Sequence, residues 1–72
     1  MKSDVFTTRF GRLVYDSGLI QRQVARELGI SQVTLTKYLN GSGRPQFNIL
    51  CKICDYFNVS ADYLIGRTDK KV

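Results

Sequence analysis

Apolar residues recur at helical spacing on both sides of Gly29. The first stripe comprises Val24, Ala25 and Leu28, and the second comprises Ile30, Leu35, Tyr38 and Leu39. Because residues three and four apart share one face of a helix, these stripes predict two short helices joined by a tight turn. Gly29 suits the left-handed conformation in which helices end, and the Ser31 hydroxyl can cap the second helix.

A longer helix is predicted near the N-terminus. Its stripe comprises Phe6, Phe10, Leu13, Val14 and Ser17. Ser3 or Asp4 would cap this helix, and Gly18 would end it. Residues 40–45 read Asn-Gly-Ser-Gly-Arg-Pro and form a loop by composition.

A fourth helix is predicted from about Gln46 to Phe57. Its stripe comprises Leu50, Ile53, Cys54 and Phe57, a set that shares one helical face. Phe47 would cover the first turn of this helix, and Asn58 would end it.

The chain closes with a fifth, short helix over residues 61–65, capped by Ser60 and ended by Gly66. No segment alternates with period two, so the pattern predicts an all-α, compact five-helix fold. We expect one domain over residues 1–66 and a polar C-terminal tail over residues 67–72 that frays.

Burial of the stripes would leave four residues on the outer face of the helix that begins at Ser31. They are Gln32, Val33, Thr36 and Lys37. Amide, hydroxyl and ammonium groups beside an apolar side chain match the groups that base pairs present in the major groove of DNA. The sequence therefore predicts a helix-turn-helix protein that binds double-stranded DNA.

Positive charge is concentrated on the same part of the chain. The 72 residues carry a net charge of +5, and residues 20–45 hold four Lys and Arg against one Glu. Residues 46–66 hold one Lys against two Asp. A basic surface over the two short helices would release counterions from DNA phosphates. Ordinary solvated surface charge is the alternative interpretation.

The composition argues against an enzyme. The chain has no His and only six Asp and Glu, so we expect no catalytic constellation, no metal site and no cofactor. Cys51 and Cys54 are at most half of a metal-binding pattern, and we interpret both as structural, reduced thiols. The chain lacks an apolar run of roughly 18–20 residues and a signal-peptide core, which predicts a cytoplasmic location.

Four segments in sequence order resemble the lambda-repressor/Cro-like helix-turn-helix family of bacterial and phage regulators. They are Gly18-Leu19-x-Gln21, Val24-Ala25-x-x-Leu28-Gly29-Ile30-Ser31, Asn40-Gly41 with Pro45 four residues on, and Tyr56-Phe57-Asn58-Val59-Ser60-x-Asp62-Tyr63-Leu64-x-Gly66. The resemblance spans about Phe10 to Gly66. It implies a transcriptional regulator, most often a repressor, whose helix from Ser31 reads DNA bases.

The resemblance also implies which residues contact DNA. The helix that opens at Gln21 would lie across the phosphate backbone, and Gln21 would pack on Gln32 so that Gln32 meets an adenine edge. We predict phosphate contacts from Gln21, Arg22, Ser31, Thr34, Asn40 and Arg44. For Ser31 and Thr34 the alternative is helix capping, and for the glutamines it is an ordinary polar helix start.

The chemistry of the remaining outer-face residues indicates their roles. Val33 would contact a thymine methyl group, because a β-branched apolar residue has no intrinsic reason to lie on an exposed helix face. Partial burial against the neighbouring helix is its alternative. Thr36 and Lys37 would reach a base or, for the flexible ammonium of Lys37, a phosphate.

Two positions depart from the family pattern. Where many members pair a buried Arg with a Glu, this chain has Val14 and Leu39, and we expect the two to touch in the core. Ile20 replaces the usual Ser or Thr cap, which removes about 1 kcal/mol of capping energy.

A single module contacts few base pairs, so we expect a homodimer on a two-fold operator, with half-sites about one helical turn apart. Tyr63 and Ile65 are the predicted dimer interface, and completion of the monomer core is the alternative. Two other functions remain open. One is an antitoxin or restriction–modification controller that depends on a protein partner, and the other is an interaction module without DNA binding.

Overall fold

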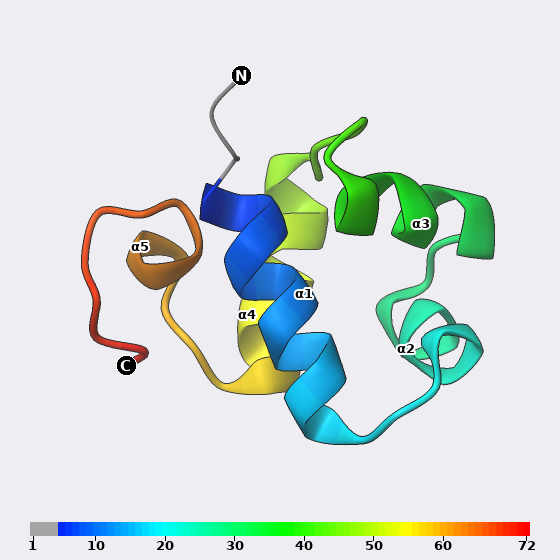
Figure 1. Cartoon of the computed structure of the whole chain (residues 1–72), viewed down its shortest axis with the longest axis horizontal. Coiled ribbons are helices and arrows are strands. Elements are labelled where there is room, and N and C mark those ends of the chain that lie inside the picture. The colour runs from blue at the N-terminus through cyan, green and yellow to red at the C-terminus, as the bar shows by residue number, and fades with distance from the viewer. Residues whose placement is uncertain (1–4) are drawn as a thin grey trace.

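The computed structural model describes residues 5–72. Within them the chain forms five helices and no strand (Figure 1). The helices are α1 (Val5–Ser17), α2 (Gln21–Leu28), α3 (Gln32–Asn40), α4 (Phe47–Phe57) and α5 (Ala61–Leu64). The prediction of an all-α, five-helix domain is confirmed. The predicted caps Ser3 and Asp4 lie outside the described residues.

Each helix contributes one large side chain that is almost completely buried. These side chains are Phe10, Leu28, Leu35, Ile53 and Leu64, in helix order. Around them the predicted stripes are buried or half-buried, with Ser17 as the exposed exception. Burial also raises the pKa of the Tyr38 hydroxyl, whose ring meets Phe6 and Phe10 edge-on. The apolar pattern of the sequence therefore specifies the core.

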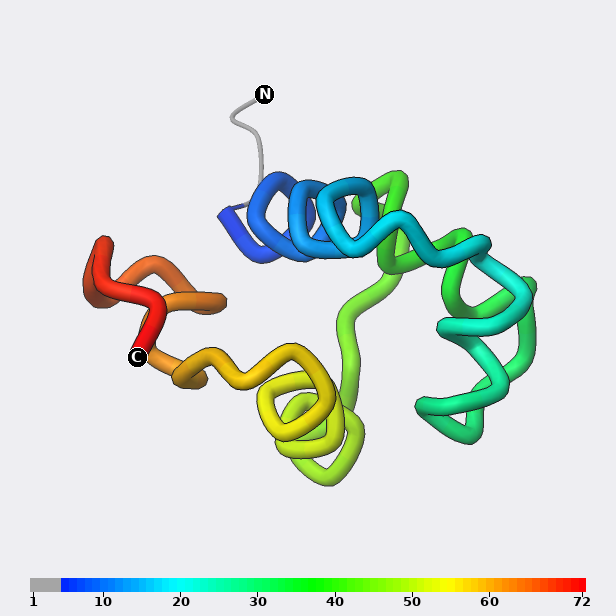
Figure 2. The backbone as a smooth tube through the Cα atoms, turned by 90° about the horizontal axis from the view of Figure 1, so that it is seen from below, coloured from blue at the N-terminus to red at the C-terminus, as the bar shows by residue number. Residues whose placement is uncertain are grey.

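Helix α1 runs through the middle of the fold. It packs against α3 on one side and against α5 on the other, while α2 contacts α3 and α4 (Figure 1). Seen at right angles, the C-terminal segment and α5 lie at the opposite end of the molecule from α2 and α3 (Figure 2). The proposed reading helix and the chain end therefore lie on different sides of α1.

The turn between α2 and α3 has the predicted conformation. Gly29 adopts φ +72°, and the Ile30 N–H donates to the Ala25 carbonyl at 3.0 Å. Ser31 then caps α3 by accepting the Thr34 N–H at 3.1 Å. Both bonds satisfy main-chain groups that a helix end leaves without partners.

Helix α4 runs over Phe47–Phe57 and follows the extended residue Gln46, which agrees with the predicted start at about Gln46. One expectation about this helix is wrong. Phe47 does not cover the first turn and is 79% exposed. Ile49 and Leu50 of the first turn pack against the core instead, and Ile53 is the one fully buried residue of α4.

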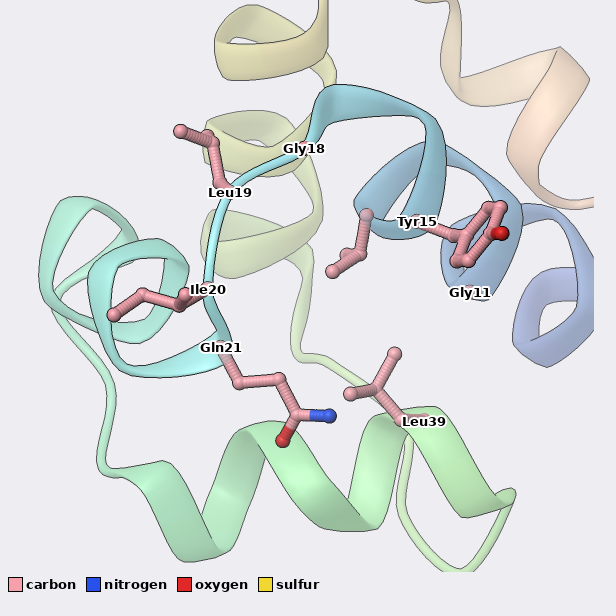
Figure 3. A pocket seen from close by; sticks show the side chains of 8 residues that line it. Gly11, Tyr15, Gly18, Leu19, Ile20, Gln21 and Leu39 are labelled. Carbon is pink, nitrogen blue, oxygen red and sulfur yellow. The ribbon is translucent and has the colours of Figure 1, made fainter.

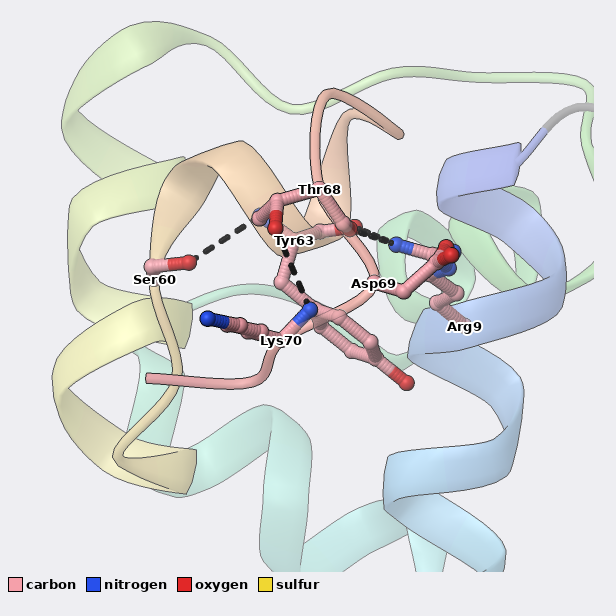
Figure 4. Close-up of polar contacts among 6 residues, drawn as sticks. All are labelled: Arg9, Ser60, Tyr63, Thr68, Asp69 and Lys70. Carbon is pink, nitrogen blue, oxygen red and sulfur yellow. Dashed lines mark hydrogen bonds and ion pairs between the residues drawn. The ribbon is translucent and has the colours of Figure 1, made fainter.

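Hydrogen bonds join the C-terminal tail to α1 and to Ser60. The Arg9 guanidinium donates to the carbonyls of Tyr63 and Thr68 at 2.5 and 2.6 Å and to the Asp69 carboxylate at 2.8 Å (Figure 4). It also lies 4.3 Å from the centre of the Tyr63 ring. Farther on, the Ser60 N–H donates to the Lys71 carbonyl at 2.6 Å. These bonds offset the conformational entropy that a polar tail would otherwise retain.

No helix in residues 5–72 is both long enough and apolar enough to span a lipid bilayer.

Candidate nucleic-acid interface

The outer face of α3 carries the four predicted base-contacting residues together. Gln32, Val33, Thr36 and Lys37 are all exposed, and they line one shallow hollow of about 420 Å³. Leu35 and Tyr38 on the opposite face are buried and hold α3 to the core. The helix has nine residues, and the roughly 10–12 Å diameter of an α-helix with its side chains fits the roughly 12 Å wide major groove.

Val33 is the most informative residue of this face. Its side chain is 67% exposed, so the alternative of partial burial against the neighbouring helix is wrong. An apolar side chain this exposed gains nothing from the fold of the free chain.

Thr36 and Lys37 are constrained by local contacts. The Thr36 hydroxyl donates to the Gln32 carbonyl at 2.9 Å, so its proton is already used within the helix. The stem of Lys37 lies against Gly43, where an added Cβ would come within 3.1 Å of the Lys37 Cβ. Gly43 therefore permits the loop after α3 to pass close beside Lys37.

Ser31 and Thr34 bond to each other at the start of α3. The Ser31 hydroxyl donates to the Thr34 hydroxyl oxygen at 2.9 Å and accepts the Thr34 N–H at 3.1 Å. These bonds form the helix cap that the sequence analysis gives as the alternative to phosphate contact for the two residues. Only the Thr34 hydroxyl proton is not used in the cap and can be donated to a phosphate.

The start of α2 presents Gln21 and Arg22, both exposed. Ile20 precedes them in an extended conformation and offers no side-chain cap, so the first N–H groups of α2 stay open to an anion. Gln21 reaches across toward α3 and Leu39 (Figure 3). No hydrogen bond joins Gln21 to Gln32 in the described residues, and their predicted packing stays a prediction.

The end of α3 and the loop after it hold the remaining predicted phosphate contacts. The Asn40 side-chain oxygen accepts the Ser42 N–H at 2.9 Å, which leaves its amide group free to donate outward. Arg44 is exposed and makes a long contact of 3.4 Å to the Gly41 carbonyl. Asn40 is the last residue of α3 and is exposed as well.

Beside this face lies an apolar groove that the sequence pattern did not predict. It has a volume of about 560 Å³ and is lined by Gly11, Val14, Tyr15, Gly18, Leu19, Ile20, Gln21 and Leu39 (Figure 3). Nothing lies within 4 Å of a Cβ built on Gly11 or Gly18. In the sequence, these two glycines and the short aliphatic residues Val14 and Leu39 are the features that could have predicted the groove.

The cysteines lie on α4, away from the outer face of α3. Both are free thiols; Cys51 is exposed and Cys54 is half-buried. Burial, and then the nearby Cys51 and Asp55, raise the pKa of the Cys54 thiol. In residues 5–72 no three His, Cys, Asp or Glu side chains are grouped so that they could hold a metal ion.

The sequence pattern of the helix-turn-helix family matches residues 12–64, most of the chain. The chain belongs to the Cro/C1-type helix-turn-helix family. It is 45% identical over 47 residues to the cryptic phage CTXphi transcriptional repressor RstR of Vibrio cholerae, covering 65% of this chain and 42% of that protein. It is 38% identical over 55 residues to the uncharacterised regulator YqaE of Bacillus subtilis, covering 75% and 47%. The chain thus spans less than half the length of these curated relatives.

Solved structures agree with the family assignment. A transcriptional regulator from Listeria innocua has a TM-score of 0.80 and 31% identity, covering 85% of this chain and 57% of that chain. The LexA repressor from Eubacterium rectale has a TM-score of 0.82 at 24% identity, covering 85% and 65%, and shows the fold alone. The resemblance inferred from the four sequence segments is confirmed. The helix-turn-helix family comprises DNA-binding transcriptional regulators.

The two departures from the family pattern meet at the apolar groove. Val14 is buried and Leu39 half-buried, and both line the groove together with Ile20. Both side chains therefore lie at the edge of the core, with solvent on one side, and their direct contact stays a prediction. Of the predicted dimer residues, Ile65 is exposed, whereas Tyr63 is half-buried beneath Arg9.

Proposed function

We propose that this chain is a sequence-specific regulator, acting as a repressor, that inserts α3 into the major groove of double-stranded DNA. The observation that carries the proposal is the outer face of α3, where Gln32, Val33, Thr36 and Lys37 surround one hollow. Among these, the side chains of Gln32 and Lys37 make no hydrogen bond or ion pair in the described structure. Their donors and acceptors are therefore available to bases.

The surroundings of α3 support contacts to the DNA backbone. Gln21 and Arg22 are exposed at the uncapped start of α2, and Asn40 and Arg44 are exposed at the end of α3 and in the loop after it. Ser31 and Thr34 lie at the start of α3. Neutralisation of phosphates by Arg22, Lys37 and Arg44 predicts binding that weakens steeply with salt.

We further propose that two copies bind a two-fold operator. A nine-residue reading helix reaches only a few base pairs, so useful specificity needs two copies. Half-sites would then be separated by about one helical turn of DNA. Tyr63 and the exposed Ile65 on and beside α5 remain the proposed contact between the copies.

Selection from a random duplex library tests the function and the symmetry together. We expect wild type to enrich a two-fold motif, and Gln32→Ala to bind that motif about 5- to 150-fold more weakly per half-site, because a bidentate base contact is lost. Gln23→Ala is the matched control, since Gln23 is also exposed but lies on α2 outside the proposed interface. Absence of any enriched motif would contradict the function, and a motif without symmetry would contradict the dimer.

A further inference from the structure

We propose that Cys51 and Cys54 form a two-coordinate binding site for a soft, thiophilic metal ion, copper(I). The inference concerns α4, so it goes beyond the proposed function and does not rest on it. It also departs from the expectation of no metal site, which applies to sites of three or four ligands. Half of such a ligand set is complete for an ion that accepts two thiolates.

The spacing of the two cysteines on α4 brings their thiols together. Both are free, and they are three residues apart within one helix. Residues at this spacing are neighbours on the helix surface, with Cβ atoms about 5–6 Å apart. Burial, and then the nearby Cys51, raises the pKa of the Cys54 thiol, which agrees with this proximity. The pair is therefore placed to bind one ligand with both sulfur atoms.

The same separation favours a bridging ion over a disulfide. A disulfide needs Cβ atoms about 3.5–4.5 Å apart, so its formation would distort α4. Two metal–sulfur bonds in line, each roughly 2.3 Å as for zinc, span about 4.6 Å between the sulfur atoms. Thiols on neighbouring helical turns reach this separation by rotation of their side chains. An ion can thus be held with the helix intact.

The ligands around the pair select the kind of ion. The chain has no His, and within the described residues 5–72 no three His, Cys, Asp or Glu side chains are grouped to hold a metal ion. A structural zinc ion takes four ligands, of which these cysteines supply two. Soft thiolates favour copper(I), whereas the neighbouring Asp55 carboxylate suits hard ions such as magnesium. Copper(I) is therefore the ion that this pair fits.

One side of the pair is closed by the protein, and the other side is open. Cys54 is half-buried and packs against the core, whereas Cys51 is exposed. Phe47 lies four residues before Cys51, which places it one turn away on the same face, and its side chain is 79% exposed. An ion can enter from solvent at Cys51 and be bound against apolar surface at Cys54.

Binding exchanges protons for the metal ion. Both thiols release their protons to solvent, since the thiolate is the form that binds a metal. Two sulfur–copper bonds form, and the two thiolates with one copper(I) carry a net charge of −1. No electron is transferred, so neither sulfur is oxidised and no other reactant is consumed.

Competition with the chelator bathocuproine disulfonate tests the site on the full, reduced chain. This chelator forms a coloured complex with copper(I), so loss of colour measures transfer of the ion to the protein. We expect wild type to take up one copper(I) per chain. Cys51→Ser and Cys54→Ser should each bind it at least about 100-fold more weakly, because a second ligand on the same chain acts at high effective concentration. Native mass spectrometry counts the ions per chain.

A variant with two thiols at the wrong spacing is the matched control. Cys51→Ser combined with Lys52→Cys keeps two cysteines and changes only exposed positions. The cysteines are then two residues apart, on different faces of α4, and should bind copper(I) as weakly as the single variants do. Thermal melting shows whether each variant is folded. Cys51→Ser alone still tests the site if the half-buried Cys54 does not tolerate serine.

Three outcomes would overturn the inference. They are no uptake of copper(I) by wild type, uptake that Cys51→Ser or the wrong-spacing variant leaves unchanged, and one ion shared between two chains. The last outcome would place the site between copies of the chain instead of on one helix. None of these outcomes changes the result of the DNA selection, so the two proposals fail independently.

Discussion

Helix α1 is attached to its two neighbours by opposite kinds of chemistry. Near its N-terminal end, Arg9 joins it to α5 and the tail through three hydrogen bonds and the Tyr63 ring. Near its C-terminal end, Val14 faces α3 and Leu39 across an apolar groove of about 560 Å³. The first attachment engages three of the five guanidinium N–H donors. The second leaves apolar surface open to solvent.

The difference shows that tight attachment and open surface lie on separate sides of one helix. The side of α1 toward α5 is closed by the polar cluster of Arg9, whose side chain is only 21% exposed. The side toward α2 and α3 is the one that carries the proposed DNA contacts. Substitutions of Arg9 should therefore change stability without removing any of the proposed DNA contacts of α2 and α3.

The largest effect should come from a charge introduced at the apolar attachment. Val14→Arg places an unpaired guanidinium beside Leu39, and we expect a loss of about 2–3 kcal/mol of unfolding free energy. For a domain of this size, that loss lowers Tm by roughly ten degrees. Differential scanning calorimetry or thermal circular dichroism would measure it.

A second substitution sharpens this test. Leu39→Glu added to Val14→Arg would restore an ion pair of the kind that many family members have, and should recover much of the lost Tm. Tyr15→Arg is the control, because Tyr15 lines the same groove but is exposed, and its change should stay within about 0.5 kcal/mol. An unchanged Tm for Val14→Arg would show that apolar contact at Val14 and Leu39 does not contribute to the stability of the fold.

The polar attachment should respond less strongly. Arg9→Ala removes three charge-assisted or main-chain hydrogen bonds and the contact with Tyr63, and we expect a loss of about 2 kcal/mol. Exchange of the Ser60 amide, which bonds to Lys71, should accelerate as the tail loosens. Calorimetry and amide hydrogen exchange by NMR would measure the two effects.

Arg12→Ala provides the contrast within the same helix. Arg12 pairs with Asp16 at 3.1 Å, but both side chains are largely exposed, so its removal should cost less than about 0.5 kcal/mol. Equal losses for Arg9→Ala and Arg12→Ala would mean that the contacts of Arg9 with the tail add no stability. Binding to the selected DNA motif should be unchanged in Arg12→Ala well below Tm.

Local patterns in the sequence predict most of the fold. The stripes around Leu28, Leu35 and Ile53, the turn at Gly29 and the cap at Ser31 depend on near neighbours in the chain, and each prediction is correct. The contacts of Arg9 depend on carbonyl groups 54 and 59 residues away. No pattern in the sequence marks such contacts, so residue spacing does not predict the attachment of the tail.

The site divides in the same way. The outer face of α3 follows from helical spacing, so the sequence alone groups Gln32, Val33, Thr36 and Lys37. The hydrogen bond of the Thr36 hydroxyl depends on a rotamer choice, because the side chain can turn toward the helix or toward solvent. The groove beside Val14 can be predicted only when the position of α1 relative to α3 is known, and residue spacing does not determine that position.

The smallest effect concerns the missing cap at the edge of the groove. Ile20 is 57% exposed and precedes α2 without capping it. Ile20→Ser would supply an oxygen for the first N–H groups of α2 and should raise stability by up to about 1 kcal/mol over Ile20→Ala, which loses the same apolar contact without adding a cap. Thermal melting of the two variants measures the difference. If the serine variant is no more stable than the alanine variant, water already satisfies these N–H groups. Leaving them available to a phosphate would then not lower the unfolding free energy of the free protein.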